Sequence, residues 1–244
     1  MARSSEPQAS REGDRLHLPT SAFTPNIPGR HYLFYGTLIH PSILRRVIGH
    51  EGNQLYITPG LLFNHTRHKI KNADYPGVLP YSSSAALFNG RELSPEEKTV
   101  RGTIVSGLTT DDIALLDIFE GDEYSREVVS VHPLGPFVPL ASTAGSDSAI
   151  IPTTPPEIPS HDGLQPAISA QTYIWKDSIA RLEPELWEFA QFVRDNAWKW
   201  VGSGSANNED YDKVDKRRAM NGRIVRTEIV VDADGTQKVQ ADRE

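Results

Sequence analysis

The chain has 244 residues, of which 38% are hydrophobic and 23% are charged, so it can bury one sizeable core but is long for one compact domain. Its formal charge of −7 gives no electrostatic reason to expect a nucleic-acid partner, since phosphate binding needs a concentrated basic face. It has no cysteine, which excludes a disulfide framework, a thiolate zinc site and a cysteine nucleophile, and favours the reducing cytoplasm.

The N-terminal segment, residues 1–29, is rich in Ser, Pro, Arg and Glu and has too little apolar surface to offset the cost of ordering, so we predict disorder. Residues 30–201 are predicted to form the folded domain. Residues 202–244 are predicted to be a polar C-terminal tail with one β-like run, "RIVRTEIVV". No apolar run approaches the length of a membrane span, so we expect no membrane partner, and the sequence leaves the oligomeric state open.

The folded part begins with an aromatic and apolar run, His31 to Tyr35, which predicts a buried strand that ends at Gly36. The next run, "HPSILRRVIG", predicts a short helix with Pro41 in its first turn and Gly49 after its end. Residues 54–70 alternate as one or two short strands. Residues 75–80, "YPGVLP", predict a loop because they hold two prolines and a glycine.

The middle of the chain predicts a strand, a helix and a second strand. The β-branched run "TVRGTIVSGL", residues 99–108, predicts the first strand. Thr109 and Asp112 then form a capping-box pattern, which predicts a helix that ends at Gly121. The run "YSREVVSVHPL", residues 124–134, predicts the second strand.

The last third of the domain starts with residues 134–168, which hold seven prolines and show neither a helical nor a strand period. We predict an insertion or a mobile loop there. "SAQTYIWK" at 169–176 predicts a strand that returns to the sheet. The run "EPELWEFAQFVRDNAWKWV" at 183–201 predicts an amphipathic helix with Pro184 in its first turn; its apolar face is Leu186, Phe189, Phe192 and Val193.

The first candidate for chemistry is the corner at Gly36, between a predicted strand and a predicted helix. A glycine there lets the backbone turn sharply and leaves successive N–H groups pointing outward, which makes a cradle for an anion or a carbonyl oxygen. The alternative is that Gly36 only turns the corner.

The second candidate is Glu120, in "LDIFEGDEY". A carboxylate at the C-terminal end of a helix is disfavoured by the helix dipole, which tends to raise its pKa and makes it a plausible base. The alternative is a surface acid. Glu120 lies between the apolar Phe119 and Gly121 at a strand-helix-strand junction, which favours a position facing the Gly36 corner.

Five stretches in this order resemble the gamma-glutamylcyclotransferase family in its AIG2-like branch: "FYGTL" at 34–38, "YPGVL" at 75–79, "VRGTIVSGL" at 100–108, "LLDIFEGDEYSREVVSV" at 115–131 and "QTYIW" at 171–175. The Tyr-Gly-x-Leu turn is short, but its combination with a later Leu-Asp-x-Phe-Glu-Gly and Tyr-x-Arg is specific. The matched stretches cover about half of the chain.

The resemblance implies an α+β fold in which a mixed, curved sheet forms a partial barrel with flanking helices. It also implies a pocket where the Tyr-Gly-x-Leu turn meets a catalytic Glu. The implied substrate is a small γ-glutamyl molecule, which is converted to 5-oxoproline and a free amine or amino acid. The site residues it implies are the base Glu120, the substrate-binding Tyr35, Gly36, Thr37 and Leu38, and further substrate-binding candidates Tyr75, Tyr124 and Arg126.

Two alternatives to this function remain open at the sequence level. One is a catalytically silent binding or interaction module of the same fold, although it would not need Glu120. The other is a pathway-specific enzyme that trims a glutathione-derived γ-glutamyl group. A metal site at His65 and His68 is disfavoured because no third ligand accompanies them, so we expect neither a metal nor a cofactor.

The sequence also contains no G-x-S-x-G elbow, no P-loop and no full G-x-G-x-x-G. We interpret Trp187, Trp198 and Trp200 as helix packing rather than a ligand box. The leaving group of the substrate, and whether residues 134–168 are a lid or inert, are left open.

Overall fold

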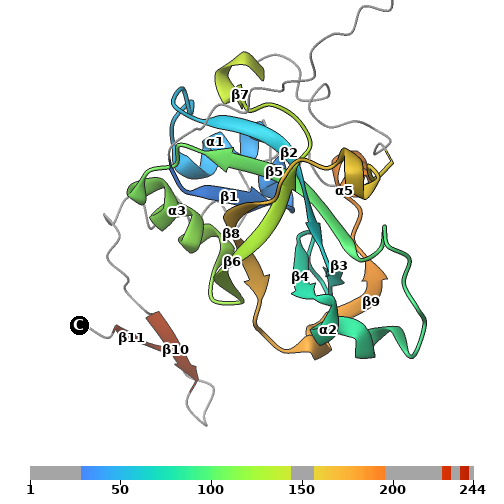
Figure 1. Cartoon of the computed structure of the whole chain (residues 1–244). Coiled ribbons are helices and arrows are strands. Elements are labelled where there is room, and N and C mark those ends of the chain that lie inside the picture. The colour runs from blue at the N-terminus through green and yellow to red at the C-terminus, as the bar shows by residue number, and fades with distance from the viewer. Residues whose placement is uncertain (1–28, 144–156, 196–226, 232–236, 242–244) are drawn as a thin grey trace, which may run out of the picture.

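The computed structural model describes residues 29–143, 157–195, 227–231 and 237–241 (Figure 1). The disorder predicted for residues 1–29 therefore concerns residues that, apart from Gly29, lie outside the described part. The same holds for most of the predicted tail, in which β10 (Thr227–Val231) and β11 (Gln237–Ala241) pair with each other as antiparallel strands. β10 lies inside the predicted β-like run.

Five strands close into a barrel. They are β1 (His31–Phe34), β5 (Thr99–Ser106), β2 (Tyr56–Phe63), β6 (Tyr124–Pro133) and β8 (Ile168–Trp175). Each pairs with the next in this order, and β8 pairs with β1 to close the ring. Only the contact between β1 and β8 is parallel. The predicted mixed, curved sheet is therefore confirmed, and the barrel is closed rather than partial.

The close approach of β5 to β1 requires a glycine at position 102. A Cβ atom at Gly102 would lie 2.4 Å from the carbonyl oxygen of Phe34. The core fills the barrel with fully buried aliphatic side chains such as Leu33, Ile104 and Val131.

Two helices cover the side of the barrel that carries β1 (Figure 1). α1 (Pro41–Ile48) begins with Pro41 and ends at Gly49, whose φ of 80° is left-handed, as predicted. α3 (Thr110–Glu120) begins with the predicted capping box of Thr109 and Asp112. The two helices pack on each other, and His50 Nε2, just after α1, lies 2.7 Å from Asp112 Oδ1.

A second, three-stranded sheet has the order β4-β3-β9. β3 (His65–Ile70) confirms a second strand in residues 54–70. The loop predicted at 75–80 was wrong, because Pro76–Pro80 is β4, paired with β3 along its whole length. β4 is an edge strand, where the missing N–H groups of prolines can face away from the ladder. It leads into α2 (Tyr81–Ser84) and the short helix η2 (Ala85–Phe88).

The long helix predicted at 183–201 was also wrong in its first part. Leu182–Leu186 is β9, which pairs with β3 through Leu182 and Leu186. A long-range pairing thus overrides the local helical period, as it often does for short apolar segments. The helix α5 begins only at Phe189 and is described to Asp195, while Trp198 and Trp200 lie outside the described residues. Trp187 and Phe192 are buried against each other, whereas Val193 is exposed.

The start of the predicted insertion is built into the fold. β7 (Val138–Pro139) pairs with β2, and the short helix η3 (Leu140–Thr143) follows. Leu140 is 1% exposed, and its backbone N–H donates to the carbonyl of Leu55 at 2.8 Å. Residues 144–156 lie outside the described part, after which come the short helix η4 (His161–Gly163) and then β8. A last short helix, η5 (Ile179–Arg181), leads from β8 into β9.

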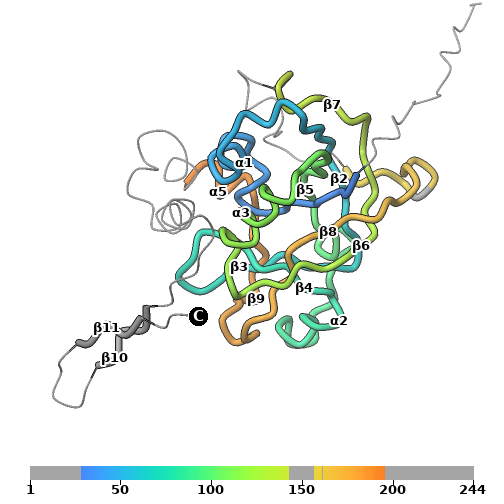
Figure 2. The backbone as a smooth tube through the Cα atoms, turned by 90° about the vertical axis from the view of Figure 1, so that its left-hand side faces the viewer, coloured from blue at the N-terminus to red at the C-terminus, as the bar shows by residue number. Residues whose placement is uncertain are grey.

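The site candidates sit on the β1 and α3 side of the barrel, where the chain leaves β1 and where α3 ends. Figure 2, turned by 90°, shows α1 and α3 close together, with β3, β4 and β9 below them. No helix among the described residues is long and apolar enough to cross a membrane.

Candidate active site

The corner after β1 is held tightly against β4. Tyr35 is buried, and Gly36 precedes the short helix η1 (Thr37–Ile39). Gly36 has a φ of −111°, so the sign of φ does not require glycine there. A Cβ atom would lie 3.1 Å from Pro76 Cδ, so close packing against β4 is a reason for glycine here in addition to the turn. Thr37 and Leu38 are also buried.

The backbone of this corner presents unused donors. The N–H groups of Ile39 and His40 close the turn on the carbonyls of Gly36 and Thr37. Within the described part of the chain, the N–H groups of Gly36, Thr37 and Leu38 have no such acceptor. These three groups are the ones from which we predicted an anion or carbonyl cradle.

Glu120 is the last residue of α3 and is half-buried. Burial raises its pKa to about 8, and the nearby carboxylates of Asp117 and Glu123 add to the rise. The pKa is raised, as we expected from the position of Glu120 at the end of a helix. The main physical cause, however, is desolvation of the carboxylate. No described residue donates a hydrogen bond to this carboxylate. The described residues thus leave its oxygens available to accept a proton or a hydrogen bond from a ligand.

Three tyrosines lie near enough to this carboxylate to respond to its charge. Burial, together with the charge of Glu120, raises the pKa of Tyr35, Tyr124 and Tyr173 above the ordinary range. Tyr75 adds to the rise in the pKa of Tyr124, so it lies near Tyr124. The structure therefore brings Tyr35 and Tyr124 near Glu120, and Tyr75 near Tyr124.

The hydroxyls of the cluster are tied to fixed partners. Tyr124 donates to the carbonyl of Pro76 at 2.9 Å, which links β6 to the strand that packs on Gly36. The Tyr35 hydroxyl donates to the carbonyl of Tyr173. Tyr173 donates to Asp117 Oδ1 at 2.8 Å. Tyr173 was missed at the level of the sequence, although it lies within the "QTYIW" stretch.

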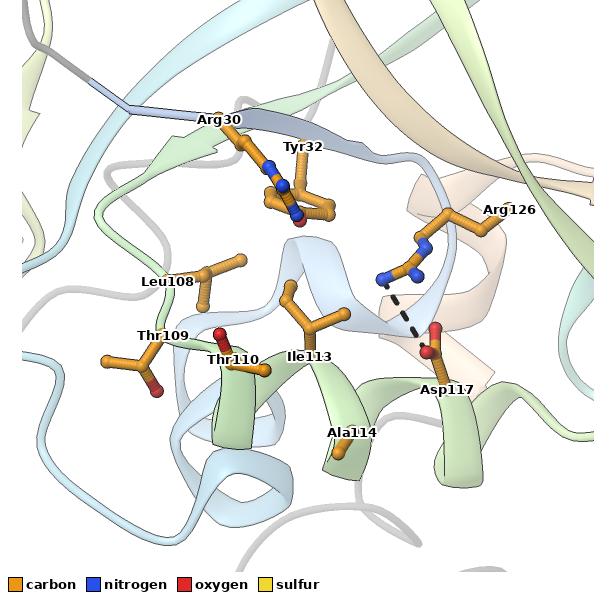
Figure 3. A pocket seen from close by; sticks show the side chains of 9 residues that line it. All are labelled: Arg30, Tyr32, Leu108, Thr109, Thr110, Ile113, Ala114, Asp117 and Arg126. Atoms are coloured by element: carbon orange, nitrogen blue, oxygen red, sulfur yellow. Dashed lines mark ion pairs between the residues drawn. The ribbon is translucent and has the colours of Figure 1, made fainter.

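Arg126 does not brace Glu120. Its Nη1 lies 3.5 Å from Asp117 Oδ2, so Arg126 and the Tyr173 hydroxyl contact different oxygens of one carboxylate. Asp117 is one helical turn before Glu120 on α3. Arg126 is therefore held beside the cluster, with its guanidinium directed along α3 towards the N-terminal end of the helix (Figure 3).

A cavity of about 370 Å³ opens at this point; it is lined by Arg30, Tyr32, Leu108, Thr109, Thr110, Ile113, Ala114, Asp117 and Arg126. Figure 3 shows Arg30, Tyr32 and Arg126 on one side and the residues of α3 on the other. Of the predicted site residues only Arg126 lines this cavity. The cavity therefore lies next to the Glu120 cluster, with Asp117 at the boundary between them. Glu120 itself does not line the cavity.

The half-buried Arg67, which contacts the backbone just before Gly36, was not predicted from the sequence. Arg67, on β3, donates from Nη1 to the carbonyls of Tyr35 at 2.7 Å and Arg101 at 3.2 Å, and from Nε to that of Trp187 at 3.2 Å. Its guanidinium also lies 4.9 Å from the centre of the Trp187 ring. Burial lowers its pKa to about 10, so it stays charged at neutral pH. Arg67 fixes the backbone immediately before Gly36.

The two histidines of β3 are bound in separate hydrogen bonds. His65 Nδ1 lies 2.8 Å from the carbonyl of Phe63, and His68 Nδ1 lies 2.9 Å from that of Glu183. The described residues contain no group of three or more His, Asp or Glu side chains that could hold a metal ion.

Comparison with known proteins bears on the fold and the motifs. Residues 32–144 match the family model described as gamma-glutamyl cyclotransferase, AIG2-like. Protein AIG2 C of Arabidopsis thaliana is 23% identical over 109 residues, which is 44% of this chain and 56% of that protein. The aligned part thus spans little more than half the length of this curated relative.

Two solved structures are similar to the chain. The Arabidopsis thaliana protein At3g28950.1 has a TM-score of 0.41 at 17% identity, over 81% of this chain and 92% of its own. A yeast gamma-glutamyl cyclotransferase specific to glutathione has a TM-score of 0.41 at 16% identity, over 78% of this chain and 87% of its own. The family match and the ordered motifs confirm the resemblance: residues 32–144 match the gamma-glutamylcyclotransferase family in its AIG2-like branch.

Proposed function

We propose that the protein is a gamma-glutamylcyclotransferase that converts a γ-glutamyl amino acid or amine to 5-oxoproline and the free amine. The observation that carries the proposal is the carboxylate of Glu120, with a pKa of about 8, whose charge acts on Tyr35, the residue just before the Gly36 corner and its unused N–H groups. The family match over residues 32–144 supports the same reaction class. The cytoplasm is part of the proposal because the chain has no cysteine.

The substrate supplies its own nucleophile. The nitrogen of its α-amine attacks the γ-carbonyl carbon, the new C–N bond closes a five-membered ring, and the bond to the leaving nitrogen breaks. The α-ammonium loses two protons in becoming the ring N–H, and the leaving nitrogen gains two if it departs as an ammonium ion. Holding the two reacting groups in attack geometry can lower the barrier by roughly 7 to 11 kcal/mol.

Glu120 is the group proposed to move these protons. Its ionised form takes a proton from the α-ammonium, and the protonated form returns one to the leaving nitrogen. Such general acid-base catalysis typically contributes about 10² to 10⁴ in rate. A pKa close to neutral pH suits both the uptake and the release of a proton. A surface carboxylate with a pKa near 4 is a weak base and is rarely protonated at neutral pH.

The corner residues are proposed to bind the γ-glutamyl half. The N–H groups of Gly36, Thr37 and Leu38 would donate to the developing oxyanion or to the α-carboxylate, and a preorganised donor at an oxyanion is worth roughly 10² or more in rate. The side chains of Thr37 and Leu38 are buried, so any role of these two residues in binding is through the backbone. Tyr35, Tyr75 and Tyr124 would form the wall around the substrate.

The direct test is release of 5-oxoproline from γ-glutamyl-alanine, γ-glutamyl-ε-lysine and glutathione, with Glu120→Gln as the blank. We expect release from at least one substrate and none above background from the variant. Release from glutathione alone would identify an enzyme that removes the γ-glutamyl group of glutathione. No release from any of the three would contradict the proposal and favour a catalytically silent binding module.

A further inference from the structure

The cavity beside α3 carries more positive than negative charge. Two guanidinium groups face it, Arg30 just before β1 and Arg126 on β6, against the single carboxylate of Asp117 (Figure 3). Among the described residues, no carboxylate lies within ion-pair distance of Arg30. The cavity therefore offers one uncompensated positive charge to a ligand.

The carboxylate of Asp117 is already occupied on both oxygens. Oδ1 accepts the Tyr173 hydroxyl at 2.8 Å, and Oδ2 lies 3.5 Å from Arg126. A contact of 3.5 Å uses little of a guanidinium that has five N–H donors in a fixed planar fork. Arg126 thus keeps donors for a second partner. Two guanidiniums on one wall of a cavity match the geometry in which arginine binds carboxylates.

The rest of the lining suits a short carbon chain. Leu108, Ile113 and Ala114 supply apolar surface, and Thr109 and Thr110 add hydroxyl groups beside it. The Tyr32 side chain is almost fully buried and lies next to Arg30 in Figure 3. A ligand that fits this lining has an apolar body and an anionic end.

The cavity begins one helical turn from the proposed base. Asp117 and Glu120 are three residues apart on α3, which is about 4.5 Å along the helix axis. Ile113 is seven residues from Glu120, or about 10 Å along the axis. A substrate with its scissile amide at Glu120 can therefore extend its leaving group along α3 into the cavity.

We propose that this cavity is the leaving-group subsite and that Arg30 and Arg126 bind a carboxylate carried by the leaving amine. The inference rests on the proposed function and narrows it. The favoured substrates are γ-glutamyl conjugates whose leaving amine ends in a carboxylate a few bonds from the nitrogen, and uncharged amines are poor substrates.

The test compares two conjugates that differ only in that carboxylate: γ-glutamyl-4-aminobutyrate and γ-glutamyl-butylamide. The measured quantity is the ratio of their kcat/KM values. We expect the parent protein to favour the 4-aminobutyrate conjugate by roughly tenfold or more. Arg30→Gln and Arg126→Gln should each bring the ratio close to one. Arg91→Gln, which removes an arginine that pairs with Glu97 far from the cavity, should keep the parental ratio.

Three results would overturn the subsite. The parent could process both conjugates equally well. The arginine variants could weaken both conjugates by the same factor, which would mean that the arginines hold the γ-glutamyl α-carboxylate instead. The Arg91→Gln control could change the ratio as much as the cavity variants do.

A binding measurement separates failure of the subsite from failure of the proposed function. Free 4-aminobutyrate and butylamine are titrated into the parent and into Arg30→Gln, with backbone amide chemical shifts as the readout. We expect 4-aminobutyrate, but not butylamine, to shift residues along the first turns of α3, and the variant to lose those shifts. If no conjugate is turned over but these shifts appear, the reaction class is wrong and the subsite stands. If conjugates are turned over without these shifts, the subsite is wrong.

Discussion

Two clusters of polar groups, one around the fully buried His68 and one around the half-buried Glu120, differ in how many hydrogen-bond partners the protein gives them. In the first, the fully buried His68 donates from Nδ1 to the carbonyl of Glu183, and its Nε2 lies 2.9 Å from Thr66 Oγ1. Thr66 Oγ1 in turn lies 2.6 Å from Ser84 Oγ. In the second, Glu120 has carboxylates and tyrosines around it but no described donor to its oxygens.

The difference separates a structural role from a chemical one. A satisfied buried network stabilises and specifies the fold, because each polar group has replaced its water partners. An unsatisfied carboxylate costs stability, and its proton is held at a higher pH than in water. The fold can tolerate Glu120 in this state only if other interactions offset its cost. That expectation can be tested by removing each cluster in turn.

The largest effect is expected for Glu120→Gln. The substitution keeps the size of the side chain and removes the proton acceptor, so kcat/KM for 5-oxoproline release should fall by about 10² to 10⁴. The variant should stay folded, which its circular dichroism and melting temperature would show. Asp122→Asn, an exposed neighbour, is the matched control and should retain parental kcat/KM. Near-parental turnover by Glu120→Gln would make Glu120 a surface acid.

The opposite outcome is expected for His68→Phe. Phenylalanine keeps a ring against Phe88 but leaves the carbonyl of Glu183 and the Thr66 hydroxyl each without one partner. The free energy of unfolding in urea should fall by roughly 2 to 4 kcal/mol, while kcat/KM at a temperature where the variant is folded should be unchanged. A loss of turnover without a loss of stability would show that the His68 cluster is coupled to the reaction.

A smaller effect is expected at the Gly36 corner. In Gly36→Val the new side chain must enter the space of Pro76 Cδ and Cγ, and overpacking of this kind costs about 1 to 3 kcal/mol. The displaced corner should raise KM more than it lowers kcat. Gly36→Ala is the matched control with one added carbon, and it should show the same pattern to a smaller extent. An unchanged KM and melting temperature in Gly36→Val would contradict a binding role for the corner.

Local signals predicted much of the fold around the site. The capping box at Thr109, the glycine after α1 and the β-branched run of β5 depend on neighbours in sequence, and they were found correctly. β4 and β9 were missed because their strand character comes from pairing with β3. The prolines of residues 75–80 and the helical period of residues 183–201 are then misleading, since pairing with a strand that is distant in sequence decides the secondary structure.

The site itself was predictable only in part. The Tyr-Gly-x-Leu and Phe-Glu-Gly stretches led to Gly36 and Glu120 through a family resemblance. Arg67 gave no such signal, because its partners are backbone carbonyls from three separate segments, and a carbonyl exists at every position of the sequence. The cavity beside α3 was missed for a similar reason, since Arg30 and Arg126 are 96 positions apart and meet only after the barrel closes.

The smallest effect is the pH dependence, and it distinguishes the two clusters in one protein. Burial raises the pKa of Glu120 to about 8, and the ionised form is the proposed base, so kcat/KM should fall about tenfold per pH unit as the pH drops below that value. Stability should follow the opposite trend at this residue. The destabilisation caused by Glu120 is absent below the unfolded pKa near 4.5, grows as the pH rises from there to about 8 and is complete above 8, so Glu120→Gln should melt higher than the parent at pH 8.5 and equally at pH 4.

At His68 the dependence of stability on pH has the opposite sign. Burial lowers its pKa from 6.5, so its contribution to stability is complete above pH 6.5 and is lost as the pH falls and the unfolded chain takes up a proton. His68→Phe should therefore flatten the loss of melting temperature between pH 6.5 and 5 and leave the pH profile of kcat/KM in place, whereas Glu120→Gln should do neither. A parental kcat/KM that is flat from pH 6 to 9 would show that the Glu120 proton is not the one transferred, because an ionisation near pH 8 in the free enzyme must appear in that profile if the ionised form is the active one.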